Sequence, residues 1–274
     1  MTSAIAPPTG FGPTIIDHTR PDPATAAATS VGSHSMGDLL VLWDIDHTLI
    51  ENYGVNKEIY GWAFELLTGT RAEHRARTEG RTEPEIMRNM LIEHGIQPAA
   101  DYSDRVLSVL ESATLSRIEK MREQGHELPG AREALTALRS TPGIIQSVLS
   151  GNIKPNAITK LSAFTLNGFI DFEVGGYGSD DHVRDNLVAI AQRRASEKYG
   201  DTFDKANTVL IGDTSRDVQA GRNGGAHVIA VASGAESPEE LRTAGADLTL
   251  PDLRDTQAVI AAVTSFQQAR GSLL

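Results

Sequence analysis

The 274-residue sequence contains no cysteine, and this absence excludes several kinds of chemistry. Disulfide bonds, a thiolate nucleophile and cysteine-bound zinc are all ruled out. The sequence also lacks any run that approaches the roughly 20 apolar residues of a membrane-spanning helix. We therefore expect a protein that does not act through thiols and does not associate with a membrane.

Basic residues are also in short supply. The chain has 25 Lys and Arg against 36 Asp and Glu, which gives a formal net charge of -11. Such an acidic chain is poorly suited to nonspecific binding of nucleic acid or of anionic lipid, so we expect neither as a partner. A phosphorylated small molecule stays possible as a substrate, because a bound metal ion and local basic groups can overcome the global field.

The N-terminal stretch, residues 1–38, differs in composition from the rest. It is rich in Ala, Thr, Pro, Ser and Gly. It lacks the basic start and the apolar core that are typical of a secretory signal. We expect a flexible tail here, folded sequence from Leu39 onward and a cytoplasmic protein. The sequence contains no indication of an oligomeric state.

The remainder alternates between two patterns. Apolar runs typical of buried parallel strands lie at 39–45, 144–149, 208–211, 226–232 and 248–250. Helical patterns lie at 130–139, 155–166, 183–198, 215–223, 238–243 and 256–268. This alternation predicts an α/β fold with a doubly wound, Rossmann-like parallel sheet. In such sheets ligands bind at the carboxyl ends of the strands.

About 75 residues after the first strand show no strand signal. Helical patterns lie at 56–68, 82–94 and 101–124, and Thr82 with Glu85 three residues later is typical of a helix N-terminus. We therefore predict a helical insert at 53–128 within an α/β core formed by 39–52 and 129–274.

Asp44 and Asp46 follow the first strand. Because residues i and i+2 of a strand point to the same side, we expect both carboxylates at one edge of the sheet. Two close carboxylates resist ionising together, so one can act as a nucleophile and the other as an acid or base. A carboxylate that attacks phosphorus forms an aspartyl-phosphate, and Mg²⁺ would suppress the repulsion between carboxylate and phosphate oxygens. Taken alone, the pair is a weak signal, and a solvated acidic turn explains it more readily.

Two later strands also end in polar residues. Ser150 follows the second strand, where its hydroxyl can donate to a phosphoryl oxygen and Gly151 allows close approach of the backbone. Asp213 follows the third and is placed to bind the metal. Asp217 lies in the first turn of the next helix, where it has three possible roles: ligation through water, orientation of neighbours, or favourable interaction with the helix dipole.

A phosphoryl site also needs a fixed cation. We expect Arg184 in this role, because it follows the loop 175–181 and begins a helix. Lys198 lies at the far end of that helix, away from the catalytic edge. Lys160 falls within a helical pattern, and we expect it to be exposed to solvent.

These motifs together resemble the haloacid dehalogenase superfamily. Asp44-Ile45-Asp46-His47-Thr48 is similar to its DxDxT motif, Ser150 to its hydroxyl motif, and Gly212-Asp213-(x)₃-Asp217 to its acidic motif. The resemblance implies that Asp44 is the nucleophile and Asp46 the general acid/base. It further implies that Asp44, the backbone carbonyl of Asp46 and Asp213 bind Mg²⁺. The chain departs from the family pattern in having Arg184 where lysine is usual.

The helical insert resembles the cap of the phosphoglycolate phosphatase and β-phosphoglucomutase branch. That likeness implies that Arg81 and Thr82 reach the substrate from the cap, beside Gly151 and Asn152 of the core. It also implies a phosphatase that hydrolyses a small phosphorylated metabolite. Two alternatives stay open: a phosphomutase of the β-phosphoglucomutase type, which uses the same residues, and a noncatalytic phosphate-binding protein. Dehalogenation is disfavoured because it has no use for Asp46.

Overall fold

A computed structural model describes residues 38–78, 80–99 and 102–271 of the chain. The tail predicted for residues 1–38 lies outside this range except for Asp38. The described elements are β1 (Leu39–Trp43), β2 (Ile50–Glu51), α1 (Val55–Thr68), α2 (Glu83–Glu93), α3 (Tyr102–Leu115), α4 (Ile118–Gln124), β3 (His126–Glu127), α5 (Ala131–Arg139), β4 (Ile144–Ser150), α6 (Lys154–Ala163), β5 (Gly176–Tyr177), α7 (Arg184–Tyr199), β6 (Thr208–Gly212), α8 (Ser215–Gly224), β7 (His227–Val231), α9 (Pro238–Ala244), β8 (Leu248–Leu250) and α10 (Thr256–Gly271).

The core is a six-stranded parallel sheet in the order β5-β4-β1-β6-β7-β8. The central strand β1 is buried at every residue, as expected for a strand covered on both faces. It pairs with β4 from Leu39 opposite Ile144 and with β6 from Leu40 opposite Thr208. The doubly wound α/β fold predicted from the alternating pattern is confirmed.

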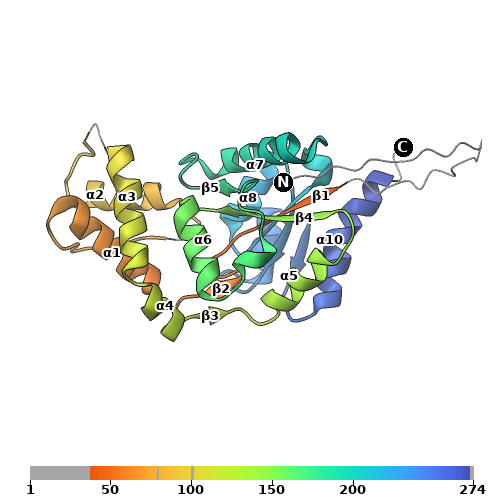
Figure 1. Ribbon diagram of the computed structural model, residues 1–274, viewed down its shortest axis with the longest axis horizontal. Coiled ribbons are helices and arrows are strands. Elements are labelled where there is room, and N and C mark those ends of the chain that lie inside the picture. Colours follow the sequence, from red (N-terminus) through yellow and green to blue (C-terminus); the bar gives the residue numbers. More distant parts are fainter. Residues whose placement is uncertain (1–37, 79, 100–101, 272–274) are drawn as a thin grey trace, which may run out of the picture. The chain divides into compact units, whose positions relative to one another are not determined.

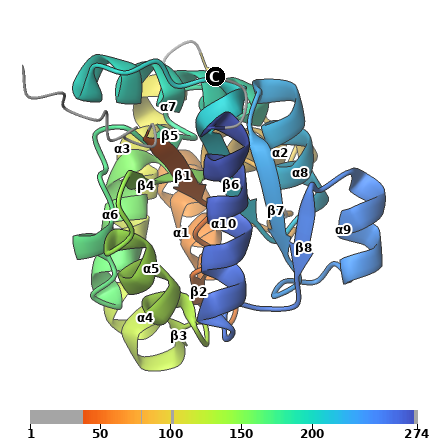
Figure 2. The ribbon, with the colours of Figure 1, turned by 90° about the vertical axis from the view of Figure 1, so that its right-hand side faces the viewer.

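Alternate residues of β1 divide the core into two layers. Leu39, Val41 and Trp43 pack with residues of α5, α6 and α10 on one face of the sheet. Leu40 and Leu42 pack with residues of α7 and α8 on the other. Figures 1 and 2 show these helices on the two sides of the strands. Because the strand alternates between faces, a single five-residue segment anchors both layers.

Helices α1 to α4 form the inserted helical cap and have a hydrophobic cluster of their own. The cluster includes Ile59, Phe64, Met87 and Leu110, all of which are buried. Its polypeptide leaves the core after β2 and returns through β3, and these two strands pair antiparallel (Figure 1). The boundaries set above for core and cap stay a prediction.

Three local predictions were wrong. Within the segment 101–124, for which one helix was predicted, the described residues form two helices, α3 and α4. The pair β2 and β3 lies in a region without a strand signal, and β5 lies in the segment assigned to a loop. Each of these strands has only two residues, which is too short to show an alternating pattern.

Candidate active site

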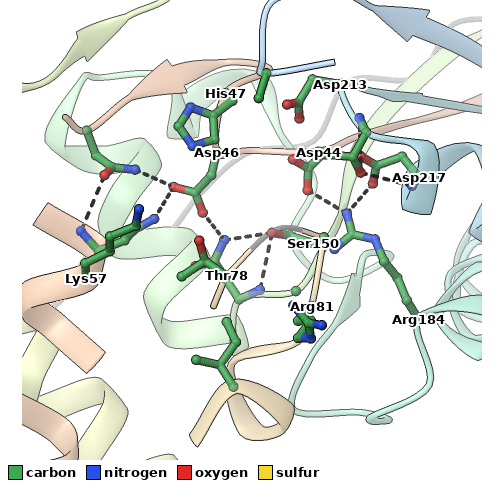
Figure 3. Close-up of a pocket in the computed structure, with 18 of the residues that line it drawn as sticks. Asp44, Asp46, His47, Lys57, Thr78, Arg81, Ser150, Arg184, Asp213 and Asp217 are labelled. Carbon is green, nitrogen blue, oxygen red and sulfur yellow. Dashed lines mark hydrogen bonds and ion pairs between the residues drawn. The ribbon is translucent and has the colours of Figure 1, made fainter. Parts of the chain in front are cut away.

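A cavity of about 350 Å³ lies at the carboxyl ends of the central strands (Figure 3). The core contributes polar side chains to its wall, namely Asp44, Asp46, Ser150, Arg184, Asp213 and Asp217. The segment leading into the cap and the cap itself contribute Asn52, Asn56, Lys57, Tyr60, Thr78 and Arg81. The polar residues that the sequence places after three separate strands thus line a single cavity, as expected of a doubly wound sheet.

Asp44 extends the ladder of the central strand. Its backbone N–H donates to the carbonyl of Ile211 at 2.8 Å, which fixes the residue against β6. Its carboxylate accepts a hydrogen bond from Nη2 of Arg184, also at 2.8 Å. Burial, followed by the negative charge of Asp217, raises the pKa of Asp44 to about 7, although Arg184 opposes this rise. The carboxylate is therefore crowded by negative charge.

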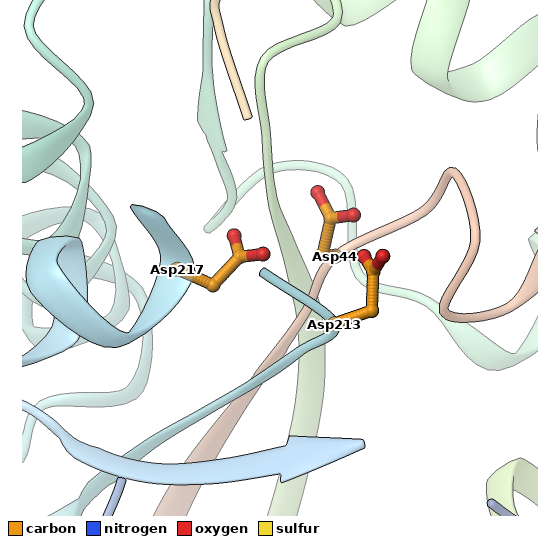
Figure 4. A group of neighbouring side chains, drawn as sticks. All are labelled: Asp44, Asp213 and Asp217. Atoms are coloured by element: carbon orange, nitrogen blue, oxygen red, sulfur yellow. The ribbon is translucent and has the colours of Figure 1, made fainter. Parts of the chain in front are cut away.

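Three buried carboxylates form the cluster shown in Figure 4. Oxygen atoms of Asp44, Asp213 and Asp217 lie within 4.8 Å of one another. Burial and the charges of the other two carboxylates raise the pKa of Asp213 well above its usual range. The guanidinium of Arg184 offsets only part of this charge. A hard divalent cation would neutralise the remainder, and carboxylate oxygens are the ligands that Mg²⁺ prefers. The donor set therefore fits a magnesium ion.

Asp213 is held from two sides. Thr48 donates its hydroxyl to Oδ1 of Asp213 at 3.3 Å, which links the first motif to the acidic motif. Gly234 lies against the other oxygen, and a Cβ atom at this glycine would be only 1.8 Å from Oδ2. Only glycine therefore fits at position 234 while Asp213 keeps this orientation.

Asp217 orients its neighbours, which is one of the three roles left open above. Its Oδ2 accepts from the backbone N–H and the hydroxyl of Thr214, at 3.1 and 2.6 Å, in a capping box at the start of α8. Its Oδ1 accepts from Nη2 of Arg184. A Cβ atom at Gly212 would lie 2.5 Å from Cγ of Asp217. The protein thus occupies both oxygens of Asp217, which holds Arg184 beside Asp44.

Asp46 is surrounded by hydrogen-bond donors. Asn52 and Asn56 donate to its Oδ1 at 3.1 and 2.9 Å, and Asn152 donates to its Oδ2 at 2.9 Å. Nζ of Lys160 lies 2.9 Å from Oδ2 and 3.2 Å from Oδ1. Burial alone would raise the pKa of Asp46, but the charge and hydrogen bonds of Lys160, together with the amide donors, outweigh burial and lower it to about 2.

The prediction that Lys160 is exposed to solvent was wrong. Its side chain is completely buried, and it pairs with Asp46 and Asn152. The positions of the apolar residues in α6 could have indicated this burial. Ala157 and Leu161 are buried and lie three residues before and one residue after Lys160, so all three share the buried side of the helix. A lysine on a buried face must have an anionic partner, because an unpaired buried charge is very costly.

Ser150, Gly151 and Asn152 lie at the end of β4, where sequence analysis expects substrate contacts. The hydroxyl of Ser150 accepts from the backbone N–H and side-chain amide of Asn152, at 3.3 and 2.7 Å. All three residues line the cavity. A Cβ atom at Gly151 would lie 2.2 Å from the carbonyl oxygen of Arg81, so this glycine allows the cap to approach the core.

On the cap side, the structure places Arg81 in the cavity wall and Thr82 outside it. Arg81 pairs with Glu85 through an Nε–Oε1 distance of 3.4 Å. Thr82 is fully buried, and its hydroxyl accepts from the backbone N–H of Glu85 at 3.4 Å as the N-cap of α2. The expectation that Thr82 contacts substrate is therefore corrected, whereas its assignment as an N-cap is confirmed.

Glu83 was missed by sequence analysis and joins the cap to the core. Its backbone N–H donates to the carbonyl of Gly151 at 2.8 Å. Its Oε2 accepts from the backbone N–H of Ile153 at 2.9 Å and from Asn156 at 2.8 Å. Burial raises the pKa of Glu83, which Lys160 partly opposes. An acidic residue in the first turn of a helix is typically explained by the helix dipole, so no local pattern indicates this second role.

His47 has an unusual backbone conformation. Its φ angle is 63°, in the left-handed region that residues other than glycine rarely adopt. Ser233 donates to its carbonyl oxygen at 2.6 Å, and its Nδ1 lies 2.9 Å from Oε2 of Glu51. These contacts stabilise the tight turn that carries the chain from Asp44 to Thr48. Strain of this kind is common at functional sites.

The fold and the site are similar to those of haloacid dehalogenase-like proteins with a helical cap. The sequence profile of the HAD-hydrolase-like family matches residues 186–256, which include the acidic motif. The resemblance seen in the motifs is thus confirmed. No curated protein sequence matches the chain significantly.

Solved structures share the fold. A hydrolase from Pseudomonas syringae is 20% identical with a TM-score of 0.58, over 82% of this chain and 99% of its own. A predicted phosphatase from Clostridium acetobutylicum is 15% identical with a TM-score of 0.57, over the same shares of the two chains. A predicted phosphoglycolate phosphatase from Haemophilus somnus is 14% identical with a TM-score of 0.56, over 83% and 99%. At these identities the comparison establishes the fold.

Among the helices of the described residues, none combines the length and the hydropathy that a membrane span requires.

Proposed function

We propose that this protein is a Mg²⁺-dependent phosphatase that hydrolyses a small phosphomonoester through an aspartyl-phosphate on Asp44. One observation carries the proposal: the carboxylate of Asp44 lies in the cavity beside a buried guanidinium that still has a donor to offer. Nη2 of Arg184 contacts Asp44 and Asp217, while its Nε has no hydrogen-bond partner among the described residues. A phosphoryl oxygen would satisfy that donor.

The residues divide the chemistry between them. Asp44 attacks phosphorus as the bond to the leaving oxygen breaks. Because the pKa of Asp46 is lowered to about 2, this carboxyl is ionised before substrate binds, so the proton that it passes to the leaving oxygen enters with the monoanion of the phosphate ester. Asp46 then removes a proton from the water that hydrolyses the acyl phosphate. Arg184 and the hydroxyl of Ser150 bind the phosphoryl oxygens throughout. Asp44, the backbone carbonyl of Asp46 and Asp213 would hold Mg²⁺, which supplies positive charge against the carboxylate and phosphate oxygens.

The cap favours a small substrate. The cavity volume of about 350 Å³ lies at the small end of the range for ligand pockets. Segment 80–83 closes over it, because Glu83 bonds to Gly151 and the carbonyl of Arg81 touches the same glycine. A cap over the site favours small substrates over nucleic acid and other macromolecules, so the substrate that we propose is a phosphorylated metabolite in the cytoplasm.

A panel of phosphate esters tests this function. We expect purified protein with Mg²⁺ to release inorganic phosphate from 4-nitrophenyl phosphate and from at least one small metabolite ester. A phosphomutase would use the same residues but would convert a sugar 1-phosphate to its 6-phosphate with little phosphate release. Binding of phosphate without turnover of any ester would instead support the noncatalytic alternative.

Arg184→Ala is expected to lower kcat/KM on 4-nitrophenyl phosphate by about 10²–10³-fold, because a preorganised cation at the phosphoryl group is lost. Lys198→Ala is the matched control. Lys198 is exposed and pairs with Asp171 at 2.6 Å, so its removal should change the rate by less than about twofold. Steady-state kinetics of both variants, with circular dichroism to confirm folding, makes the comparison. A larger loss in Lys198→Ala would show that Arg184 is not the essential cation.

A further inference from the structure

Lys160 has no role in the mechanism above, although it is completely buried next to the proposed acid/base. Nζ lies 2.9 and 3.2 Å from the two oxygens of Asp46. It also donates to Oδ1 of Asn152 at 2.5 Å. The side chain of Lys160 is 0% exposed, whereas that of Asp46 is 20% exposed and lines the cavity. Lys160 therefore reaches Asp46 from the protein interior and does not itself line the cavity.

The amide of Asn152 completes a closed set of contacts. Its Oδ1 accepts from Lys160, and its Nδ2 donates both to Oδ2 of Asp46 at 2.9 Å and to the hydroxyl of Ser150 at 2.7 Å. The lysine thus determines the orientation of the amide, since only the oxygen of Asn152 can face an ammonium group. With the amide fixed in this way, its nitrogen faces Asp46 and Ser150 together.

The members of this network come from different elements. Lys160 lies in the second turn of α6, Asn152 in the loop after β4, and Asp46 in the turn after β1. The N-terminus of α6 is itself fixed, because Ile153 and Asn156 donate to the buried carboxylate of Glu83. Asn156 and Lys160 are four residues apart and so lie on one face of the helix. Lys160 consequently projects from a helix that is anchored at its start.

We propose that Lys160 is a positioning residue, which with Asn152 holds the carboxylate of Asp46 at the leaving-group oxygen. This inference rests on the proposed phosphatase function and adds a residue to it. Lys160 acts through Asp46 and does not contact the phosphoryl group. Its contribution should therefore depend on how much the leaving group needs a proton. A residue that only stabilised the fold would affect all substrates alike.

The test compares two aryl esters that bind alike and differ in their leaving groups. Phenolate needs protonation, with a pKa of about 10 for a phenol of the tyrosine type, whereas 4-nitrophenolate departs readily without it. With enzyme in excess, Lys160→Met should slow the first-turnover release of phenol from phenyl phosphate by about 10²-fold, within the range for loss of general-acid catalysis. It should slow the first-turnover release of 4-nitrophenol by less than about fivefold. Release of the aryl alcohol precedes hydrolysis of the acyl phosphate, so this measurement does not include the role of Asp46 as a base. Retained 4-nitrophenyl phosphatase activity also shows that the variant is folded.

Two further variants sharpen the result. Lys154→Met is the control on the same helix, since Lys154 is partly exposed and pairs with Glu173, and neither substrate should be affected. In an Asp46→Asn background, Lys160→Met should cause no additional loss of rate with phenyl phosphate, because the carboxylate that Lys160 positions is already absent. Equal losses on both substrates in Lys160→Met, or additive losses in the double variant, would overturn the positioning role. The phosphatase function would stand in either case, because it is judged by turnover of the wild-type protein.

Discussion

Replacing Asp44 by asparagine is expected to lower kcat on 4-nitrophenyl phosphate by about 10⁴-fold or more, the scale of loss seen when an enzyme loses its nucleophile. An amide nitrogen cannot attack phosphorus, and the amide oxygen is a far weaker nucleophile than a carboxylate. The oxygen of the introduced amide would still accept the hydrogen bond that Arg184 donates at 2.8 Å, so the site should keep its shape. Release of inorganic phosphate under saturating substrate measures the effect.

The control for this variant is Asp252→Asn. This variant makes the same chemical change at the surface. Asp252 pairs with Arg254 and does not line the cavity. We expect its activity to match the wild type. Thermal unfolding of both variants should show that they are folded. A fully active Asp44→Asn enzyme would remove Asp44 from the role of nucleophile.

Removal of divalent metal is expected to abolish activity almost completely, and added Mg²⁺ should restore it. The reason is the cluster of Asp44, Asp213 and Asp217, whose oxygens lie within 4.8 Å of one another. Without a metal ion, the bound phosphate would face this concentration of negative charge with only Arg184 beside it. Phosphate release with EDTA, then with EDTA and excess Mg²⁺, is the measurement. Turnover that persists after chelation would contradict the metal assignment.

Thermal stability gives a readout that does not depend on turnover. The pKa of Asp44 is raised to about 7 and that of Asp213 is also raised, chiefly by burial. A carboxyl group with a raised pKa contributes stability that is complete below its unfolded pKa of about 4 and is lost as pH rises through the folded value. The metal-free protein should therefore be less stable at about pH 8 than at about pH 5. Mg²⁺ binds the ionised carboxylates, so it should raise Tm more at the higher pH.

Much of the site could be predicted from sequence because its residues follow recognisable strands. Asp44, Ser150 and Asp213 each come at or next to the end of an apolar run, and parallel strands bring their carboxyl ends to one edge. Arg184 could be chosen by its place at the start of a helix, and the structure puts it 2.8 Å from Asp44. For these residues, both the local sequence pattern and the topology of the sheet predict a position at the carboxyl edge of the strands.

The remaining contacts depend on packing between segments that are distant in sequence. Lys160 falls within a helical pattern, where a lysine is expected to be exposed, but an anionic partner overrides this tendency. Its partner Asp46 lies 114 residues away. Glu83 likewise reaches Ile153 across 70 residues. No periodicity in a single sequence encodes such pairs. The strands β2, β3 and β5 have only two residues each, so they are too short to show an alternating pattern of apolar and polar residues.

The covalent intermediate on Asp44 can be tested directly by chemical trapping. The protein with Mg²⁺ would be quenched during turnover of 4-nitrophenyl phosphate, treated with borohydride and digested for mass spectrometry. Borohydride reduces an aspartyl-phosphate to homoserine, so we expect homoserine at position 44 in the wild type and none in Asp44→Asn. Homoserine at position 46, or an unmodified position 44 in enzyme that is turning over, would contradict nucleophilic attack by Asp44.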